Sequence, residues 1–265
     1  MKHFSRLALL TIAGLSAVSA QAALSYAITE GGNFFAFEHA RPDAPYGVTA
    51  IAGLIPGEKL VGIDARPANG MLYGIGSFGN LYVLDKRTGA AMMVNMVNVM
   101  PNGAKFGVDF NPVPDRLRVT STQRQNLRIN VDTGVAIVDG MLSYGSPTMP
   151  SIVASAYTNN FAGTTTTQLF NIDSETDSLV LQSPPNDGTL VAVGPLGIDI
   201  DDRAGFDIFT TGTVNRAFAA LNVTGGNTSA LYSINLRSGA ATLVGNFRGS
   251  DRVIGFAVDA GETRR

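Results

Sequence analysis

The sequence predicts an all-β protein, a five-bladed β-propeller in which one blade is closed by both chain termini. Three observations predict this fold. A passage of short strands returns about every 45 residues, a period typical of propeller blades. The segment Leu81–Asp85 with its turn Thr88–Gly89 returns as Leu231–Asn235 with Ser238–Gly239. The two chain ends resemble the two missing parts of one further copy.

The N-terminal segment has the pattern of a secretory signal peptide. Lys2 and Arg6 precede an apolar run over residues 7–18, and small residues surround a cleavage position after Ala22. A membrane anchor is the alternative, but the run is too short for a hydrocarbon core of roughly 30 Å. We therefore expect residues 1–22 to be removed on export, with no membrane span afterwards and a final location in the periplasm or outside the cell.

Composition excludes several function classes for the remaining chain. Residues 23–265 suit a single β-propeller domain, and the absence of cysteine excludes disulfides and thiol chemistry. Of the 19 basic residues of the full chain, Lys2 and Arg6 lie in the signal peptide, which leaves 17 basic against 21 acidic residues. They form no long basic run, so nucleic acid is not an expected partner. His3 lies in the signal peptide, which leaves His39 alone and disfavours a histidine-built zinc site or a serine triad.

Four copies of the repeat lie between the chain ends. Each copy reads as four strands, A to D from the axis outward, bounded by Gly, Asn and Pro. We expect the A strands of these copies to begin at Leu60, Phe106, Ile152 and Leu196, with Leu196 opening the segment Leu196–Asp199.

The chain ends supply the fifth blade in this interpretation. Val253–Ala257 resembles strand A, and Tyr26–Thr29, Phe34–Glu38 and Val48–Ile51 resemble strands B, C and D. Pairing of the two ends would close the ring and remove exposed edge strands, which otherwise template aggregation. An open β-sandwich is the alternative, because periodicity indicates repetition more securely than closure.

A short polar residue recurs in one turn of each of the four copies. It lies four residues before the end of the turn, where a glycine follows in three copies of four. Such side chains bond the backbone two residues on, and glycine supplies the positive φ of the turn. We therefore interpret these residues as turn formers rather than as a metal ladder: Asp85, Asn130, Asp173 and Asn235.

Three aspartates occupy one position of the expected A strands. Asp64, Asp109 and Asp199 each follow Gly-Ile or Gly-Val, whereas the other two copies carry Ala156 and Ala257. Carboxylates that meet near the axis would bind Ca²⁺ through oxygen or supply the acid and base of glycoside cleavage. Alternatively, each carboxylate accepts backbone hydrogen bonds at a strand end.

Four arginines gather in the second copy. Arg116 and Arg118 alternate along strand B and so share a face, Arg128 lies on strand C, and Arg124 lies in the hairpin between them. Guanidinium groups on a rigid sheet can bind a carboxylate or phosphate bidentately, which would suit an acidic glycan or a small anion. Three aspartates of the same copy could instead neutralise them: Asp109, Asp115 and Asp132.

The same copy carries a family resemblance. Phe106–Val119 followed by Gln125–Gly134 resembles the bacterial exported family known as domain of unknown function 4394. The likeness extends from Leu60 to Asp259 and includes Ala156–Phe161 and Pro184–Gly188. The resemblance implies a propeller-like secreted or periplasmic domain, and it supplies no catalytic residues.

These observations favour a non-enzymatic exported binding or interaction module. Its ligand would be a carbohydrate, a small anion or an envelope protein. One alternative is a glycoside hydrolase of furanosidase type that uses Asp64, Asp109 and Asp199. Another is a structural domain stabilised by Ca²⁺ at the same three residues, and no other cofactor is expected.

Overall fold

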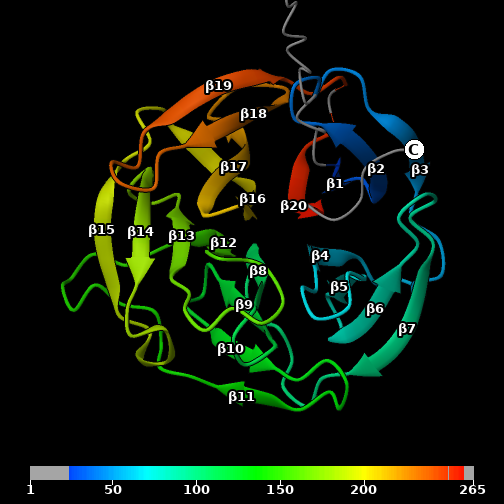
Figure 1. The fold of residues 1–265 in the computed structure, drawn as a ribbon, viewed down its shortest axis with the longest axis horizontal. Helices are drawn as coiled ribbons and strands as arrows, with labels where there is room; N and C mark the ends of the chain where they lie inside the picture. The colour runs from blue at the N-terminus through cyan, green and yellow to red at the C-terminus, as the bar shows by residue number, and fades with distance from the viewer. Residues whose placement is uncertain (1–23, 250, 260–265) are drawn as a thin grey trace, which may run out of the picture.

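The computed structural model describes residues 24–249 and 251–259, and within them five four-stranded antiparallel sheets form a ring (Figure 1). The chain is therefore a five-bladed β-propeller, as the repeat predicts, rather than an open sandwich. The predicted signal peptide, residues 1–22, lies outside the described residues. Among the described residues no helix has the length and apolar character needed to cross a membrane.

The blades follow one another around the ring, each from the axis outward. Blade 1 contains β4 (Leu60–Ala65), β5 (Leu72–Gly76), β6 (Asn80–Leu84) and β7 (Ala91–Met96). Blade 2 contains β8 (Phe106–Asn111), β9 (Arg116–Ser121), β10 (Asn126–Ile129) and β11 (Ala136–Val138). Blade 3 contains β12 (Ile152–Tyr157), β13 (Leu169–Asp173), β14 (Ser178–Gln182) and β15 (Leu190–Pro195), with the short 3₁₀ helix η1 (Pro185–Asp187) between β14 and β15. Blade 4 contains β16 (Ile200–Thr211), β17 (Val214–Val223), β18 (Ser229–Ile234) and β19 (Ala241–Asn246). Blade 5 contains β20 (Val253–Asp259), β1 (Leu24–Thr29), β2 (Asn33–Glu38) and β3 (Tyr46–Ala50).

Blade 5 is built from both ends of the chain. β20 pairs antiparallel with β1, so that Ser25 lies opposite Val258 and Ala27 opposite Phe256. This pairing confirms the predicted closure, and β20 takes the innermost place that strand A holds in the other blades (Figure 1).

The apolar core lies between the faces of neighbouring blades. Tyr73 and Ile75 of blade 1 pack in one cluster with Phe110 and Leu117 of blade 2. Complete burial of one such side chain is worth about 1.5–3 kcal/mol. Because each face is covered only by the next blade, the blades stabilise one another around the ring.

Glycine lets the inner strands approach one another closely. A Cβ on Gly62 would lie 2.3 Å from a methyl group of Val108 on the next inner strand. A Cβ on Gly205 would lie 2.7 Å from the Cβ of Phe256. The Gly that precedes each inner aspartate by two residues is therefore required by packing around the axis.

The predicted turn chemistry is present in each repeat. Asp85 Oδ1 accepts backbone hydrogen bonds from Arg87 and Thr88, and Asn235 Oδ1 accepts one from Arg237. Asn130 and Asp173 form the same bond two residues on, but the Asp173 turn joins β13 to β14, the second and third strands of blade 3, instead of its two outer strands. The residues that end these turns have φ between 48° and 80°: Gly89, Gly134, Asp177 and Gly239.

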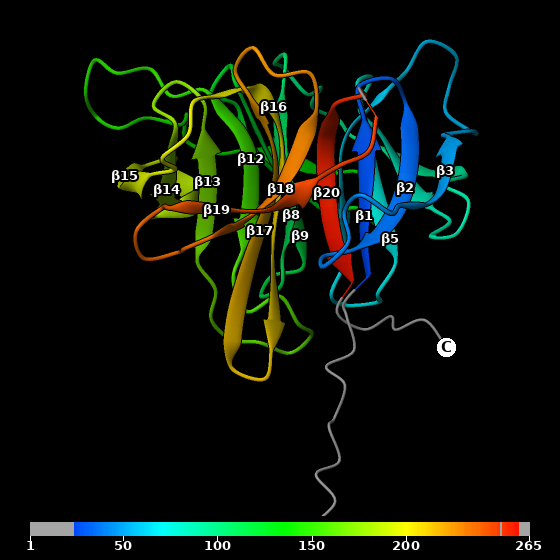
Figure 2. The same cartoon turned by 90° about the horizontal axis from the view of Figure 1, so that it is seen from above.

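Blade 4 differs from the other blades in length. β16 and β17 have 12 and 10 residues, and Figure 2 shows their hairpin extending below the ring. The expected inner strand Leu196–Asp199 is wrong, because Gly197 has a φ of 80° and β16 begins only at Ile200.

Candidate functional site

A pocket of about 350 Å³ opens at one end of the axial channel. Its floor is apolar, and all five inner strands contribute apolar residues to it: Leu60, Val61, Phe106, Val153, Ala204 and Ile254. Its rim carries two basic and two acidic side chains: Lys59, Lys105, Glu30 and Asp202. The pocket therefore combines an apolar base with a polar rim of balanced charge.

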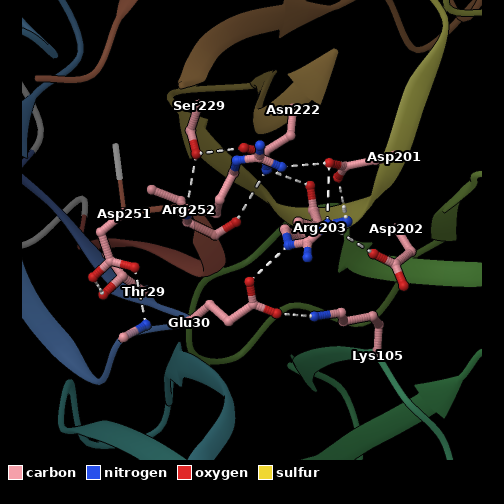
Figure 3. A network of polar contacts seen from close by, with 12 residues as sticks. Thr29, Glu30, Lys105, Asp201, Asp202, Arg203, Asn222, Ser229, Asp251 and Arg252 are labelled. Carbon is pink, nitrogen blue, oxygen red and sulfur yellow. Dashed lines mark hydrogen bonds and ion pairs between the residues drawn. The ribbon is translucent and has the colours of Figure 1, made fainter. Parts of the chain in front are cut away.

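Glu30 connects blade 5 with blades 2 and 4 across this rim (Figure 3). It lies in the turn between β1 and β2, and its carboxylate accepts hydrogen bonds from Lys105 Nζ at 2.6 Å and Arg203 Nε at 2.7 Å. The hydrogen bonds from Lys105 and Arg203 lower the pKa of Glu30 to about 2. Lys59 Nζ donates to the Glu30 carbonyl oxygen at 3.3 Å.

The ion pairs continue from Arg203 toward the junction of blades 4 and 5. Arg203 and Arg252 both contact Asp201 Oδ2, at 3.2 Å and 2.8 Å (Figure 3). Arg203 also contacts Asp202 at 3.5 Å. Sequence reasoning missed this rim, although Lys59 and Lys105 each immediately precede the apolar start of an inner strand. Arg203 lies within β16, one residue before the apolar part of that strand.

Three aspartates meet further along the axis, and two of them are those expected. One ligand atom each of Asp64, Asp109 and Asp207 lies within 4.8 Å of the other two. Their side chains lie in residues that are only 0 to 1% exposed. The third member is Asp207 of β16, and not Asp199.

Asp199 lies in the loop before β16 and is exposed. Its Oδ1 accepts a hydrogen bond from Thr224 Oγ1 at 2.6 Å. Its expected place at the axis is therefore wrong. The Gly-Ile-Asp match at residues 197–199 falls in a bend, whereas Gly205-Phe206-Asp207 has the inner-strand position.

The aspartates link successive inner strands through backbone N–H groups. Asp64 Oδ2 accepts from Phe110 at 2.7 Å, Asp109 Oδ1 from Tyr157 at 3.1 Å, and Asp207 Oδ2 from Val258 at 2.5 Å. Two of the acids also accept from the next residue in their own strand, through Asp64 Oδ1 and Asp207 Oδ1. The structure thus favours the alternative in which these carboxylates accept backbone hydrogen bonds.

Burial governs the protonation of this cluster. Burial, followed by the charge of Asp207, raises the pKa of Asp64 well above its usual range. Burial, followed by the charges of Asp64 and Asp207, does the same to the pKa of Asp109. Burial raises the pKa of Asp207 to about 7, against the opposing effect of its two backbone hydrogen bonds.

The same geometry bears on the glycosidase alternative. A pair of catalytic carboxyl groups flanks a substrate at about 5–9 Å in an open site. Asp64 and Asp109 are fully enclosed, and neither lines the pocket of about 350 Å³. These residues therefore do not form the open pair of carboxyl groups that would favour a furanosidase.

Two of the four predicted arginines, Arg118 and Arg128, belong to an internal network. Arg118 is 1% exposed and donates to Asp139 at 2.6 Å and to Asn186 of η1 at 2.8 Å. Arg128 also contacts Asp139, at 2.6 Å. The expected neutralisation thus occurs, but through Asp139.

Two of the expected acidic partners serve the preceding blade instead. Asp115 and Asp132 both pair with Arg66, at 2.5 Å and 2.7 Å. Arg116 donates to the carbonyl oxygens of Pro114 and Asp115, and Arg124 lies in the β9–β10 hairpin with a φ of 63°. Arg116 and Arg124 are therefore not drawn into the Asp139 network.

His39 lies against blade 4 beside a serine. Its Nε2 is 2.6 Å from Ser25 Oγ, and its ring stacks on Phe218 at 4.3 Å between centroids. Ser25 is 0% exposed, so this pair packs blades 4 and 5 together and does not present a nucleophile. Burial lowers the pKa of His39 to about 4.

Comparison with known proteins identifies a family and similar solved structures. A family model described as Domain of unknown function (DUF4394) matches residues 33–257. No curated protein matches the sequence. A chain of the structure described as "Crystal structure of Nidogen/Laminin Complex" is similar at 13% identity and a TM-score of 0.51, over 91% of this chain and 99% of that chain. A Lactobacillus plantarum protein is similar at 17% identity and a TM-score of 0.44, over 89% of this chain and 71% of that chain.

Proposed function

The chain belongs to the DUF4394 family, and from that premise we propose that it is an exported binding module that holds a carbohydrate in the pocket at the mouth of its axial channel. The observation that carries this proposal is the pocket itself. Its volume of about 350 Å³ lies within the range of small-molecule sites, which is about 300–1,000 Å³.

The chemistry of the pocket suits a sugar. A sugar ring has an apolar face, which the floor of Phe106, Val153 and Ile254 can cover. Its hydroxyl groups both donate and accept hydrogen bonds, and the rim offers ammonium donors at Lys59 and Lys105 and carboxylate acceptors at Glu30 and Asp202. Because the four rim charges balance, an uncharged polar ligand fits better than a small anion.

The rim is also organised before a ligand arrives. Glu30 is held between Lys105 and Arg203, and all five inner strands contribute to the floor. A rigid site loses little conformational entropy on binding, which supports affinity for a small ligand. The ring of five blades therefore holds the pocket residues in place before a ligand binds.

Export rests on the N-terminal pattern. A basic start, a short apolar run and small residues before position 23 are typical of a signal peptide. The cysteine-free composition is compatible with an oxidising compartment. The N-terminal sequence of the protein recovered from culture medium and periplasm tests this part, and a start at Ala23 is the expected result.

Calorimetric titration with a panel of neutral mono- and oligosaccharides tests the ligand. Ala104 is exposed and lines the pocket, so Ala104→Trp should fill it and weaken binding at least about tenfold. Ala40→Trp places the same side chain at an exposed position that does not line the pocket, and should bind as the native chain does. Arg116→Ala, in the predicted anion cluster, should also bind normally.

Two results would contradict the proposal. One is the absence of heat with every sugar in the panel, and the other is equal binding by native protein and Ala104→Trp. Tighter binding of acidic glycans that depends on Arg116 would move the site to the arginine cluster.

A further inference from the structure

The three axial carboxylates have a feature that backbone hydrogen bonding does not explain. We propose that Asp64, Asp109 and Asp207 bind one Ca²⁺ ion on the propeller axis. This site is separate from the sugar pocket, because none of the three acids lines that pocket. The proposal therefore does not depend on the proposed function.

The spacing of the acids matches a calcium coordination shell. Ca²⁺ binds oxygen at about 2.3–2.6 Å, so oxygens on opposite sides of the ion lie about 5 Å apart. One oxygen from each of Asp64, Asp109 and Asp207 lies within 4.8 Å of the others. All three ligands are carboxylates, which favours a hard cation over zinc or copper.

Asp109 supplies the second and independent observation. Its Oδ2 is completely buried and has no hydrogen-bond partner among the described residues. Asp64 and Asp207 differ, since each uses both oxygens for backbone N–H groups. A buried acceptor without a donor is costly, and a cation is the partner that it lacks.

The origin of this unpartnered oxygen lies in the asymmetry of the ring. The inner strands that precede β4 and β16 in the ring carry Ala257 and Ala156 at the aspartate position. The N–H groups of Ala65 and Ile208 therefore donate to the preceding residues of their own strands, Asp64 and Asp207. The N–H of Phe110 is already taken by Asp64, so Asp109 receives only the N–H of Tyr157. One carboxylate oxygen in the ring thus remains without a donor.

The negative charge of the three buried carboxylates also indicates a bound divalent cation. Carboxylates so close together and so deeply buried do not ionise together unless a cation offsets their charge. In the residues that the structure describes, no lysine, arginine or histidine is bonded to Asp64, Asp109 or Asp207. A divalent ion would offset two of the three charges while the backbone bonds persist, because each oxygen has two lone pairs.

The choice of Ca²⁺ over Mg²⁺ follows from the geometry. Mg²⁺ requires a near-ideal octahedron at about 2.0–2.1 Å, whereas Ca²⁺ accepts irregular shells of six to eight oxygens. Inner strands set by blade packing cannot contract around a smaller ion. With three acids as its only protein ligands, we expect a dissociation constant of about 10⁻⁴–10⁻³ M, the range of extracellular calcium modules.

Titration of EDTA-treated full chain tests the site. Calcium added to about 10 mM should give one binding event by calorimetry and raise the melting midpoint by several degrees. Terbium(III), a luminescent calcium substitute, offers a second readout. The chain has no tryptophan, so emission excited through tyrosine would report binding close to a tyrosine such as Tyr157.

Asp109→Asn is the informative variant. The amide keeps an acceptor for Tyr157 and the same shape but loses the charge, so calcium affinity should fall at least tenfold. Asp199→Asn removes a carboxylate of the same kind outside the cluster and should bind calcium as the native chain does. Far-ultraviolet circular dichroism of both variants shows whether they are folded.

Three outcomes would overturn the proposal. They are a native melting midpoint unchanged by calcium, a folded Asp109→Asn that binds calcium as tightly as the native chain, and a loss of binding in Asp199→Asn alone. If Asp109→Asn does not fold, the native calorimetric and terbium titrations still decide, since the absence of both signals means that protons neutralise the acids.

Discussion

Asp64 accepts a hydrogen bond of 2.7 Å from the backbone N–H of Phe110, which joins the inner strand of blade 1 to that of blade 2. The bond crosses 46 positions of sequence and is fully buried. Asp109 and Asp207 form the corresponding links to Tyr157 and Val258. The aspartates of the inner strands therefore connect blades through the backbone, in addition to the apolar contacts between blade faces.

Asp64→Ala should destabilise the ring. The substitution leaves the buried N–H groups of Ala65 and Phe110 without an acceptor, and each such group costs about 1–3 kcal/mol. We expect the free energy of unfolding in EDTA-containing buffer to fall by about 2–4 kcal/mol. Urea denaturation measures it. Asp199→Ala, at an exposed position, should change it by no more than about 0.5 kcal/mol, and equal effects would contradict the interpretation.

Removal of β20 should abolish cooperative unfolding. A chain that ends at Arg252 lacks β20, the inner strand of blade 5. It therefore lacks both the strand that pairs with β1 and the side chain of Phe256, which packs in the aromatic cluster. A chain that ends at Asp259 keeps the complete strand and is the matched control. Calorimetric melting should show a sharp transition for the control and a broad or absent one for the shorter chain. If the shorter chain melts as sharply and at the same temperature, β20 does not close the ring.

His39 should make stability depend on pH. Burial lowers its pKa from 6.5 to about 4, so the unfolded chain binds a proton between these values that the folded chain does not. The part of the free energy of unfolding that depends on a neutral His39 is fully present above pH 6.5 and is lost as the pH falls toward 4. This loss amounts to about 3 kcal/mol at most. His39→Gln cannot bind this proton, so its free energy of unfolding should not show this decrease.

The native chain must be compared with His39→Gln because Asp207 has the opposite effect on how stability changes with pH. Its pKa is raised to about 7, so its contribution decreases as the pH rises through this range. The difference between native and His39→Gln free energies of unfolding, measured by urea denaturation at several pH values, isolates the histidine. A difference that stays constant from pH 7 to pH 4 would show that His39 titrates normally.

Arg118 should be far more important to stability than its neighbour Arg116. Arg118→Ala leaves Asp139 buried with one partner fewer and removes the contacts with Tyr157 and Asn186. Loss of one member of a buried ion pair costs about 3–5 kcal/mol. Within the described part of the chain, Arg116 donates only to nearby carbonyl groups, so Arg116→Ala should cost less than about 1 kcal/mol. Urea denaturation of both variants measures the difference, and a small effect of Arg118→Ala would show that Asp139 is solvated.

Much of the fold is readable from local patterns. The turn at Thr88–Gly89 and its copies at Gly134 and Gly239 mark the boundary between the two outer strands of a blade, because an Asx side chain and a positive φ are local requirements. The apolar strand at Val253–Ala257 indicates that an inner strand is supplied by the C-terminal end. These features depend on residues that are neighbours in sequence.

The site was predictable only in part, because its contacts join distant segments. Asp199 matches the local pattern of the inner aspartates, but the bend at Gly197 keeps it out of β16, and Asp207 reaches the axis. Arg118 finds its counter-ion at Asp139, beyond the end of β11. Glu30 meets Lys105 and Arg203 from three different blades, and no spacing in the sequence indicates that contact.

The order of residues alone establishes the number of blades, their turns and the joining of the two ends, because these follow from a repeated local pattern and its interrupted copy. Folding decides which acids face the axis, which oxygen of Asp109 lacks a donor, and which charges surround the pocket. The physical reason is that five inner strands converge on one line, so that side chains more than 40 residues apart share a space whose burial and charge no single blade determines.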